Sequence, residues 1–255
     1  MQVAVFSDIH ANLPALEAVL RDTEEVDVQE LWCLGDVVGY GASPNECVSL
    51  VAERCKACLV GNHDLAVLDR LDTSTFSGAA AAAVEWTAEH SSKESLDFLG
   101  GLHPADSTRP AALYHASPRD PIWEYVLWPE QAAECLVAQE RRVSFIGHSH
   151  VALFFSAKEG EEDGDGTGAG SPPEASGWQA GAGTRLEINE GRWLINPGSV
   201  GQPRDGDPRA AWLELDTDSW QATYHRVTYE VERAAAAIEE AGLPDHLARR
   251  LFVGR

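Results

Sequence analysis

The sequence has little positive charge and no long apolar run. Its 255 residues include 19 Lys and Arg against 41 Asp and Glu, which gives a formal net charge of −22. A surface of that sign repels nucleic acid and anionic membranes in general. No apolar segment approaches the roughly 20 residues that span a bilayer, and the first residues lack the basic start of a signal peptide. We therefore expect a cytoplasmic protein with no membrane partner and no general nucleic-acid binding.

Cysteine is also scarce, with five residues, an odd number that cannot pair completely. In a chain without an export signal the default state is the reduced thiol. Cys55 and Cys58 have Cys-x-x-Cys spacing, which suits free thiols, half of a metal site or a redox pair. Because the sequence has no second motif of this kind, free thiols are the favoured interpretation.

The beginning of the chain alternates apolar strand patterns with amphipathic helix patterns. Strands are expected over residues 2–6, 29–34 and 57–60, separated by a helix that opens near Leu13 and a helix over 44–54. The composition, 44% hydrophobic and 24% charged, is that of a globular protein. This β-α-β-α-β order predicts an α/β fold with a parallel sheet.

The rest of the chain is expected to be richer in strands. The predicted strands cover residues 111–115, 142–146, 151–157, 184–188, 191–195, 210–216 and 220–227. The predicted helices cover residues 78–90, 92–99, 129–139, 229–241 and 244–251. Residues 158–183 break the pattern, because they are rich in Gly, Ser and acidic side chains. We expect this segment to be a long mobile insert.

Potential metal ligands follow the proposed strands at the points where those strands end. These residues are Asp8, His10, Asp36, Asn62, His115, His148 and His150. In an open α/β sheet, groups at the carboxyl ends of the strands converge on one crevice. The sequence therefore predicts that these seven side chains meet, although they are far apart along the chain.

The residue types and their spacing indicate a metal centre. Asp8 and His10 are two residues apart, as are His148 and His150, so on a regular strand each pair would point to one face. Carboxylate, amide oxygen and neutral imidazole are ligands of borderline or hard divalent metals. One tetrahedral ion needs only three or four ligands. Seven ligands with one shared carboxylate suit two ions about 3.5–4 Å apart.

These motifs resemble those of the calcineurin-like metallophosphoesterase superfamily, whose pattern is D-x-H, G-D, G-N-H-[D/E], H and G-H-x-H. The match runs from Asp8 to His150, and residues 196–200 (Asn-Pro-Gly-Ser-Val) add to it. The sequence is most similar to small bacterial phosphodiesterases or phosphatases of that superfamily. The resemblance implies a single domain over residues 1–255, in which two packed mixed β-sheets are flanked by helices.

The resemblance also implies a role for each residue of the motifs. The implied ligands are Asp8, His10 and His150 for the first metal, Asn62, His115 and His148 for the second, and Asp36 as the bridge between them. His63 would face the leaving oxygen or a phosphoryl oxygen without ligating a metal. Asp64 would orient His63 and stabilise its charge.

The activity implied is hydrolysis of phosphoester bonds in small substrates by a hydroxide that bridges the two metals. Phosphodiesters, nucleotides and dinucleoside polyphosphates are the expected substrates. Two divalent ions, two carboxylates and one hydroxide leave the site near +1 within a chain of −22, so the site attracts an anionic ester. Mn²⁺ is expected to give the highest activity, with Fe, Zn²⁺, Ni²⁺ and Co²⁺ as the other metals that suit these ligands.

The substrate contacts are less determined by the sequence than the metal ligands. Tyr40 stands where protein Ser/Thr phosphatases of the superfamily have a phosphate-binding Arg, so a protein phosphatase is less favoured. Tyr40, Arg119 and Arg204 are the candidate substrate contacts, and Trp123, Tyr125 and Trp128 line a pocket rim or pack in the core. The alternatives are a phosphomonoesterase or protein phosphatase, an inactive metal-binding scaffold, and a thiol redox protein. The sequence does not determine the oligomeric state.

Overall fold

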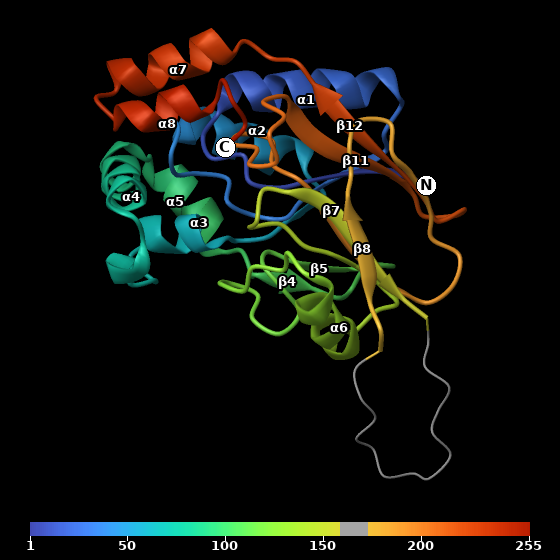
Figure 1. The fold of residues 1–255 in the computed structure, drawn as a ribbon. Helices are drawn as coiled ribbons and strands as arrows, with labels where there is room; N and C mark the ends of the chain where they lie inside the picture. The colour runs from blue at the N-terminus through green and yellow to red at the C-terminus, as the bar shows by residue number, and fades with distance from the viewer. Residues whose placement is uncertain (159–172) are drawn as a thin grey trace.

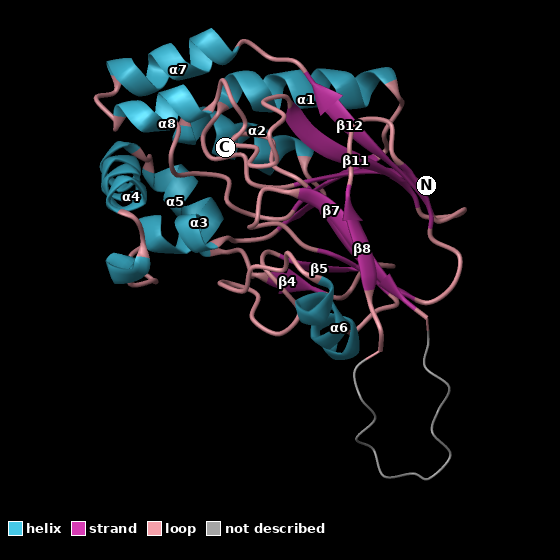
Figure 2. Ribbon diagram, in the orientation of Figure 1, coloured by secondary structure: helices cyan, strands magenta, loops and turns pink. Residues whose placement is uncertain are grey.

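The computed structural model describes residues 1–158 and 173–255, which form two six-stranded mixed β-sheets with helices around them (Figures 1 and 2). Across the first sheet the order is β3 (Ala57–Cys58), β2 (Glu30–Cys33), β1 (Gln2–Phe6), β11 (Ala210–Asp216), β12 (Gln221–Val227) and β9 (Arg185–Glu187). Across the second sheet it is β4 (Ala105–Asp106), β5 (Ala112–Tyr114), β6 (Val143–Phe145), β10 (Arg192–Pro197), β7 (Ala152–Ala157) and β8 (Ser176–Gln179).

The first sheet contains the parallel unit that the sequence predicts. β1 pairs with β2 and β2 with β3 in parallel, whereas β11 runs antiparallel to β1. The second sheet is mixed in the same way, because β6 is parallel to both β5 and β10 while β7 is antiparallel to β10. The expected α/β fold with two mixed sheets is confirmed.

Helices cover the outer faces of both sheets (Figure 2). They are α1 (Leu13–Glu25), α2 (Pro44–Arg54), α3 (Asn62–Val67), α4 (Gly78–His90), α5 (Lys93–Gly100), α6 (Pro129–Ala138), α7 (Val231–Glu240) and α8 (Asp245–Arg250). The start of α1 follows from local chemistry, because the Asn12 side chain accepts a hydrogen bond from the backbone N–H of Ala15 at 3.2 Å. None of the helices in the described part of the chain is long and apolar enough to cross a membrane.

The alternation of β1 shows how the layers pack. Val3 and Val5 lie in the core between the two sheets, whereas Ala4 and Phe6 lie in the core between the first sheet and its helices. This is the period of two that a strand imposes on its side chains. On the far side of the second sheet, α6 packs against β7 and β10 (Figure 1). The molecule therefore has a helix–sheet–sheet–helix order of layers.

Four short elements in the described part of the chain were not predicted. They are α3, a 3-10 helix over Thr73–Thr75, β4 and β8, each of six residues or fewer. The expectation of a loop throughout residues 158–183 is wrong for its end, because Ser176–Gln179 pairs antiparallel with β7. Residues 159–172 of the predicted insert lie outside the described residues. Such short strands carry too few residues for their alternation to be recognised.

Candidate metal centre

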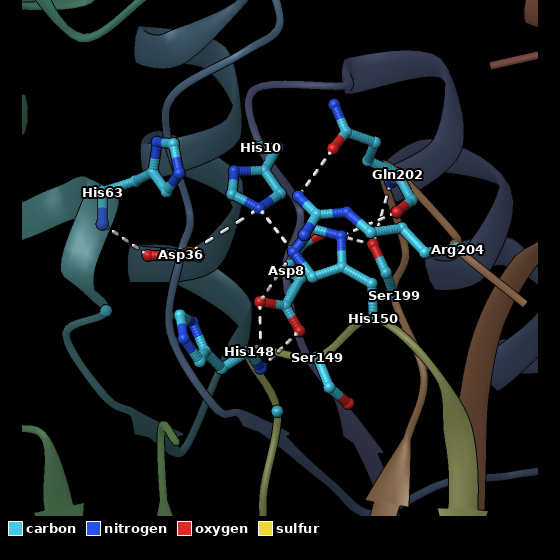
Figure 3. A network of polar contacts seen from close by, with 12 residues as sticks. Asp8, His10, Asp36, His63, His148, Ser149, His150, Ser199, Gln202 and Arg204 are labelled. Carbon is cyan, nitrogen blue, oxygen red and sulfur yellow. Dashed lines mark hydrogen bonds and ion pairs between the residues drawn. The ribbon is translucent and has the colours of Figure 1, made fainter. Parts of the chain in front are cut away.

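All seven predicted ligands lie just beyond the carboxyl ends of strands, six on loops and Asn62 at the first position of a helix. Asp8 and His10 follow β1, Asp36 follows β2 and Asn62 begins α3 just after β3. His115 follows β5, and His148 and His150 follow β6, so the second sheet supplies the remaining three. The structure brings the loops of both sheets together at one edge, where several of these side chains converge (Figure 3).

The backbone at these loops is left-handed rather than extended. The φ angles are 56° at Asp8, 49° at His10, 51° at Asp36, 62° at His148 and 59° at His150. The expectation that each Asp/His or His/His pair shares one face of a strand is therefore wrong, because both pairs lie beyond the end of their strand. A non-glycine residue in this region costs about 1–3 kcal/mol, and such residues gather at functional sites.

Hydrogen bonds from neighbouring loops hold this strained backbone. The N–H of Asp8 donates to the carbonyl of Gly35 at 3.0 Å, and that of His10 donates to the carbonyl of Asp36 at 2.9 Å. The carbonyl of Asp8 in turn accepts from the Ser199 hydroxyl at 2.8 Å. Ser199 belongs to the Asn-Pro-Gly-Ser-Val segment, which therefore braces the loop after β1.

Two imidazoles face each other without a proton between them. Nδ1 of His10 lies 3.1 Å from the carbonyl oxygen of Val38, and Nδ1 of His150 lies 2.7 Å from that of Gln202. Because a carbonyl only accepts, each Nδ1 carries the ring proton and each Nε2 presents a lone pair. Burial lowers the pKa of both rings well below the usual value, which disfavours a second proton. Their Nε2 atoms are nevertheless 3.1 Å apart, a contact that a cation stabilises.

The same pattern recurs beside His115. Its Nδ1 lies 2.9 Å from the carbonyl oxygen of Leu34, so its Nε2 also presents a lone pair. That Nε2 is 3.2 Å from Asn62 Oδ1, which is an acceptor in this orientation of the amide. Two acceptors again face each other inside the protein.

Asp36 lies between the facing pair of His10 and His150 and the facing pair of His115 and Asn62. Its Oδ2 is 3.6 Å from Nε2 of His10 and 3.7 Å from Nε2 of His115. Oδ2 is buried and has no hydrogen-bond partner, and neither does Nε2 of His148. Buried polar atoms are almost always satisfied, so these orphaned atoms indicate a missing partner.

The donor atoms form two groups that suit divalent cations. Within each group the atoms lie no more than 4.8 Å from one another, and the groups are Asp8, His10, Asp36 and His150, and Asp36, His115 and His148. Asp36 belongs to both groups. Carboxylate and imidazole donors around a shared carboxylate fit two divalent ions in adjacent positions.

Burial makes ionisation of the Asp8 and Asp36 carboxyl groups energetically costly without a nearby cation. It raises the pKa of Asp8 to about 7. Burial, and then the negative charge of Asp64, also raises the pKa of Asp36 well above its usual value. A divalent cation bound between such groups offsets this penalty by stabilising the ionised forms.

His63 occupies an aromatic enclosure next to the ligands. Its ring centroid is 4.3 Å from that of Tyr40, 4.9 Å from that of Phe76 and 4.9 Å from that of His10. Nδ1 is buried without a hydrogen-bond partner, and a Cβ added to Gly39 would lie 2.6 Å from it. Burial lowers the pKa of His63 to about 3, which keeps the ring neutral.

Asp64 has partners other than the one expected from the resemblance. Its Oδ1 accepts from the N–H of Val38 at 3.0 Å and its Oδ2 accepts from the N–H of Gly61 at 2.9 Å. The expected contact with His63 is absent, because Asp64 is the third residue of α3 and turns back to cap the start of that helix. Asp64 therefore joins the loop after β2 to the loop after β3.

A pocket of about 730 Å³ opens beside the ligand cluster. Asn62, His63 and His148 line it from the cluster side. Tyr40 and Arg204, two of the three predicted substrate contacts, also line it. The aromatic and basic side chains that complete the wall are Phe76, Trp123, Tyr125 and Arg250.

Other predicted contacts lie outside this pocket. Arg119 forms ion pairs with Glu124 and Glu134 and does not line this pocket. Trp128 is 66% exposed and lines a separate groove beside β8. Sequence reasoning missed Phe76 and Arg250, which no motif marks and which only the packing of distant segments brings to the pocket.

The cysteines take no part in this site. All five are free thiols, as the sequence favoured, and none belongs to a ligand group formed by the described residues. Burial raises the pKa of Cys55 well above the usual value, and a hydrogen bond with Cys33, followed by burial, does the same for Cys58, which makes these thiols poor nucleophiles.

Comparison with known proteins agrees with this geometry. Residues 1–218 match the calcineurin-like phosphoesterase superfamily domain. The uncharacterised protein MJ0912 of Methanocaldococcus jannaschii is 36% identical over 266 residues, which cover 99% of this chain and 98% of that protein.

Solved structures show the same fold over the full length. A metallophosphoesterase from Sphaerobacter thermophilus superposes with a TM-score of 0.85 at 39% identity, covering 100% of this chain and 99% of that one. The hypothetical protein PH1004 from Pyrococcus horikoshii OT3 has a TM-score of 0.74 at 18% identity, covering 100% and 98%. The second likeness concerns the fold alone.

Proposed function

The chain belongs to the calcineurin-like phosphoesterase superfamily, and we propose on this premise that it hydrolyses phosphodiesters of small molecules with two divalent metal ions. The observation that carries the proposal is the pair of facing acceptors in each half of the cluster, joined by the orphaned Oδ2 of Asp36. Mn²⁺ is the ion that we propose for highest activity, because the oxygen and nitrogen ligands suit it.

Each ion is assigned to one group of ligands. Asp8, His10 and His150 would hold one ion, Asn62, His115 and His148 would hold the other, and Asp36 would contact both. When bound, the two ions supply Lewis acidity that activates water and neutralises charge on the phosphoryl group. The carbonyl oxygens of Val38, Leu34 and Gln202 fix the imidazoles so that Nε2 points at the ions.

His63 is the residue that we propose for contact with the leaving oxygen. It lines the pocket beside Asn62 and His148, while its Nδ1 is buried near Gly39. Nε2 is therefore the ring nitrogen that remains open to a substrate. A neutral ring with the proton on Nε2 donates a hydrogen bond to the oxygen that departs, which stabilises the developing charge.

Asp64 is a positioning residue in this proposal. Its two backbone contacts set the distance between the loop that carries Asp36 and the loop that carries Asn62 and His63. His63 also donates its backbone N–H to Asp36 Oδ1 at 2.9 Å. The residue proposed to contact the leaving oxygen, His63, is thus hydrogen-bonded through its backbone to Asp36, the carboxylate shared by both groups of ligands.

Hydrolysis of two aryl phosphates tests the proposal. The full chain, loaded with Mn²⁺, is assayed with bis(p-nitrophenyl) phosphate and with p-nitrophenyl phosphate. We expect faster hydrolysis of the diester, loss of activity with a chelator and recovery when Mn²⁺ is restored. Preference for the monoester would make the protein a phosphomonoesterase instead. A loaded protein that is inert to both esters would contradict the proposal and favour a metal-binding scaffold.

A further inference from the structure

Two arginines that form no ion pair with an Asp or Glu of the described residues line the pocket. They are Arg204, on the loop after β10, and Arg250, at the end of α8. Arg204 Nη2 donates to Gln202 Oε1 at 2.9 Å, and its buried Nε has no partner (Figure 3). Arg250 Nε donates to the backbone oxygen of Arg255 at 2.6 Å.

Neither guanidinium forms an ion pair with an Asp or Glu within residues 1–158 and 173–255. Burial, and then the charge of Arg204, lowers the pKa of Arg250, so the two cations repel each other. An anion bound between them would relieve this repulsion and satisfy the free donors.

Arg204 lies one aromatic ring away from the ligand cluster. The Tyr40 ring centroid is 4.6 Å from that of His10 and 4.3 Å from that of His63. On its other side the same ring is 5.8 Å from the guanidinium carbon of Arg204, and the Tyr40 hydroxyl is 3.5 Å from Arg204 Nη2. A substrate phosphoryl group bound at the cluster therefore places the adjacent phosphoryl group within reach of Arg204, in the pocket that Arg250 also lines.

Aromatic side chains form another wall of the pocket. The Phe76 ring lies 4.9 Å from His63, and Trp123 meets Phe76 edge-on at 5.5 Å. The Tyr125 ring is 4.2 Å from that of His148 and is 41% exposed. Half-buried rings that open to a pocket provide stacking surfaces for a planar group such as a nucleobase.

We propose that the pocket selects a nucleotide with two consecutive phosphoryl groups. One phosphoryl group binds at the ligand cluster, the second binds between Arg204 and Arg250, and the base lies against Phe76 and Trp123. The contact between a phosphoryl group and the ligand cluster rests on the proposed function. Hydrolysis of such a substrate needs only water, whose hydroxyl joins phosphorus while its proton goes to the oxygen of the broken P–O bond.

Binding of two matched nucleotides tests the arginine contact. The full chain at saturating Mn²⁺ is titrated calorimetrically with α,β-methylene-ADP, which resists hydrolysis between its phosphoryl groups, and with AMP. We expect the two-phosphoryl ligand to bind about tenfold more tightly, which corresponds to about 1.4 kcal/mol. Equal affinity for the two ligands would overturn the assignment of Arg204 and Arg250.

Substitutions distinguish the contact with the second phosphoryl group from the contact with the base. Arg250→Gln should weaken binding of α,β-methylene-ADP about tenfold and leave AMP unchanged, while Arg250→Lys should retain most of the affinity. Trp123→Ala should weaken both nucleotides about tenfold and leave inorganic pyrophosphate unchanged. The matched controls are Arg249→Gln, whose side chain pairs with Asp245 at 3.2 Å, and the exposed Trp128→Ala.

The two proposals fail in different ways. If bis(p-nitrophenyl) phosphate is hydrolysed but Arg250→Gln and Trp123→Ala bind nucleotides as the wild type does, the nucleotide assignment is wrong and the phosphodiesterase proposal stands. If the variants discriminate as expected but no phosphoester is hydrolysed, the binding site stands and the hydrolytic function is wrong.

Discussion

The ligand cluster has two halves that meet the pocket differently. The inner half is Asp8, His10 and His150, and the outer half is Asn62, His115 and His148. Asn62 and His148 line the 730 Å³ pocket, whereas no residue of the inner half does. In the inner half both imidazoles are fixed by carbonyl oxygens. In the outer half His115 is fixed in the same way by Leu34, whereas His148 lines the pocket. The inner half is thus enclosed by the fold, and the outer half is open to what enters the pocket.

Backbone strain is distributed in the same unequal way. All three residues of the inner half have left-handed φ angles, whereas in the outer half only His148 does. The hydrogen bonds to neighbouring loops maintain this strain whether or not an ion is present. Because a prearranged site loses less entropy on binding, we expect the inner half to bind its ion more tightly than the outer half.

Removing the carboxylate shared by both halves should have the largest effect. We expect Asp36→Asn to lower the occupancy of both ions and to reduce kcat/KM by about 10³-fold or more, because several kcal/mol of charge stabilisation depend on them. Elemental analysis and diester hydrolysis measure the two effects. Asp69→Asn is the control, since Asp69 is an exposed carboxylate that also has a left-handed φ angle, 55°. Full occupancy in Asp36→Asn would contradict the shared role.

Single ligand variants should distinguish the two halves. After dialysis against a weak chelator, we expect His148→Ala to retain one ion per chain, whereas His150→Ala should lose the tightly bound ion, with its affinity lowered about 100-fold or more. The reason is that His150 belongs to the prearranged half. Equal metal retention by the two variants would remove the distinction between the inner and outer halves.

Replacing His63 should affect turnover and leave the metals in place. We expect His63→Ala to keep both ions and to lose about 10²–10³-fold in kcat, the usual effect of removing one hydrogen-bond donor that stabilises developing charge. Metal content and steady-state kinetics on the same sample measure this. The exposed His103→Ala provides the comparison for loss of an imidazole. Unchanged turnover in His63→Ala would show that the assigned contact with the leaving oxygen is wrong.

The sequence predicts the cluster better than it predicts the pocket. Asp8 and Asp36 follow neighbouring parallel strands of one sheet, whose geometry brings such positions together. His115, His148 and His150 follow strands of the second sheet, so their approach to Asp8 and Asp36 also depends on how the two sheets pack, which the order and spacing of the motifs do not specify. The left-handed backbone of the loops could not be inferred either, because it depends on hydrogen bonds to loops distant in sequence, such as the one between Asp8 and Gly35.

The residues that line the pocket are brought together by tertiary contacts, which no local sequence pattern indicates. Phe76 lies in a short connection and Arg250 at the end of the last helix, and only tertiary packing places them near His63. Arg119 shows the opposite case, since this basic residue near a ligand motif forms ion pairs with Glu124 and Glu134 and does not line the pocket. Asp64 was recognised by its motif, yet its partners are backbone amides that no sequence pattern specifies.

A single added methyl group tests how closely the loops of the outer half approach Asp36. A Cβ at Gly61 would lie 2.0 Å from Asp36 Oδ1 and 2.6 Å from its backbone nitrogen, so Gly61→Ala should lower the free energy of unfolding by about 3 kcal/mol. Gly78→Ala, with open space at the start of α4, should raise it by about 0.5 kcal/mol. Urea unfolding with a chelator present measures both, because bound ions then make no contribution. If the two variants unfold at the same urea concentration, the shared carboxylate is not held by the loop of the outer half.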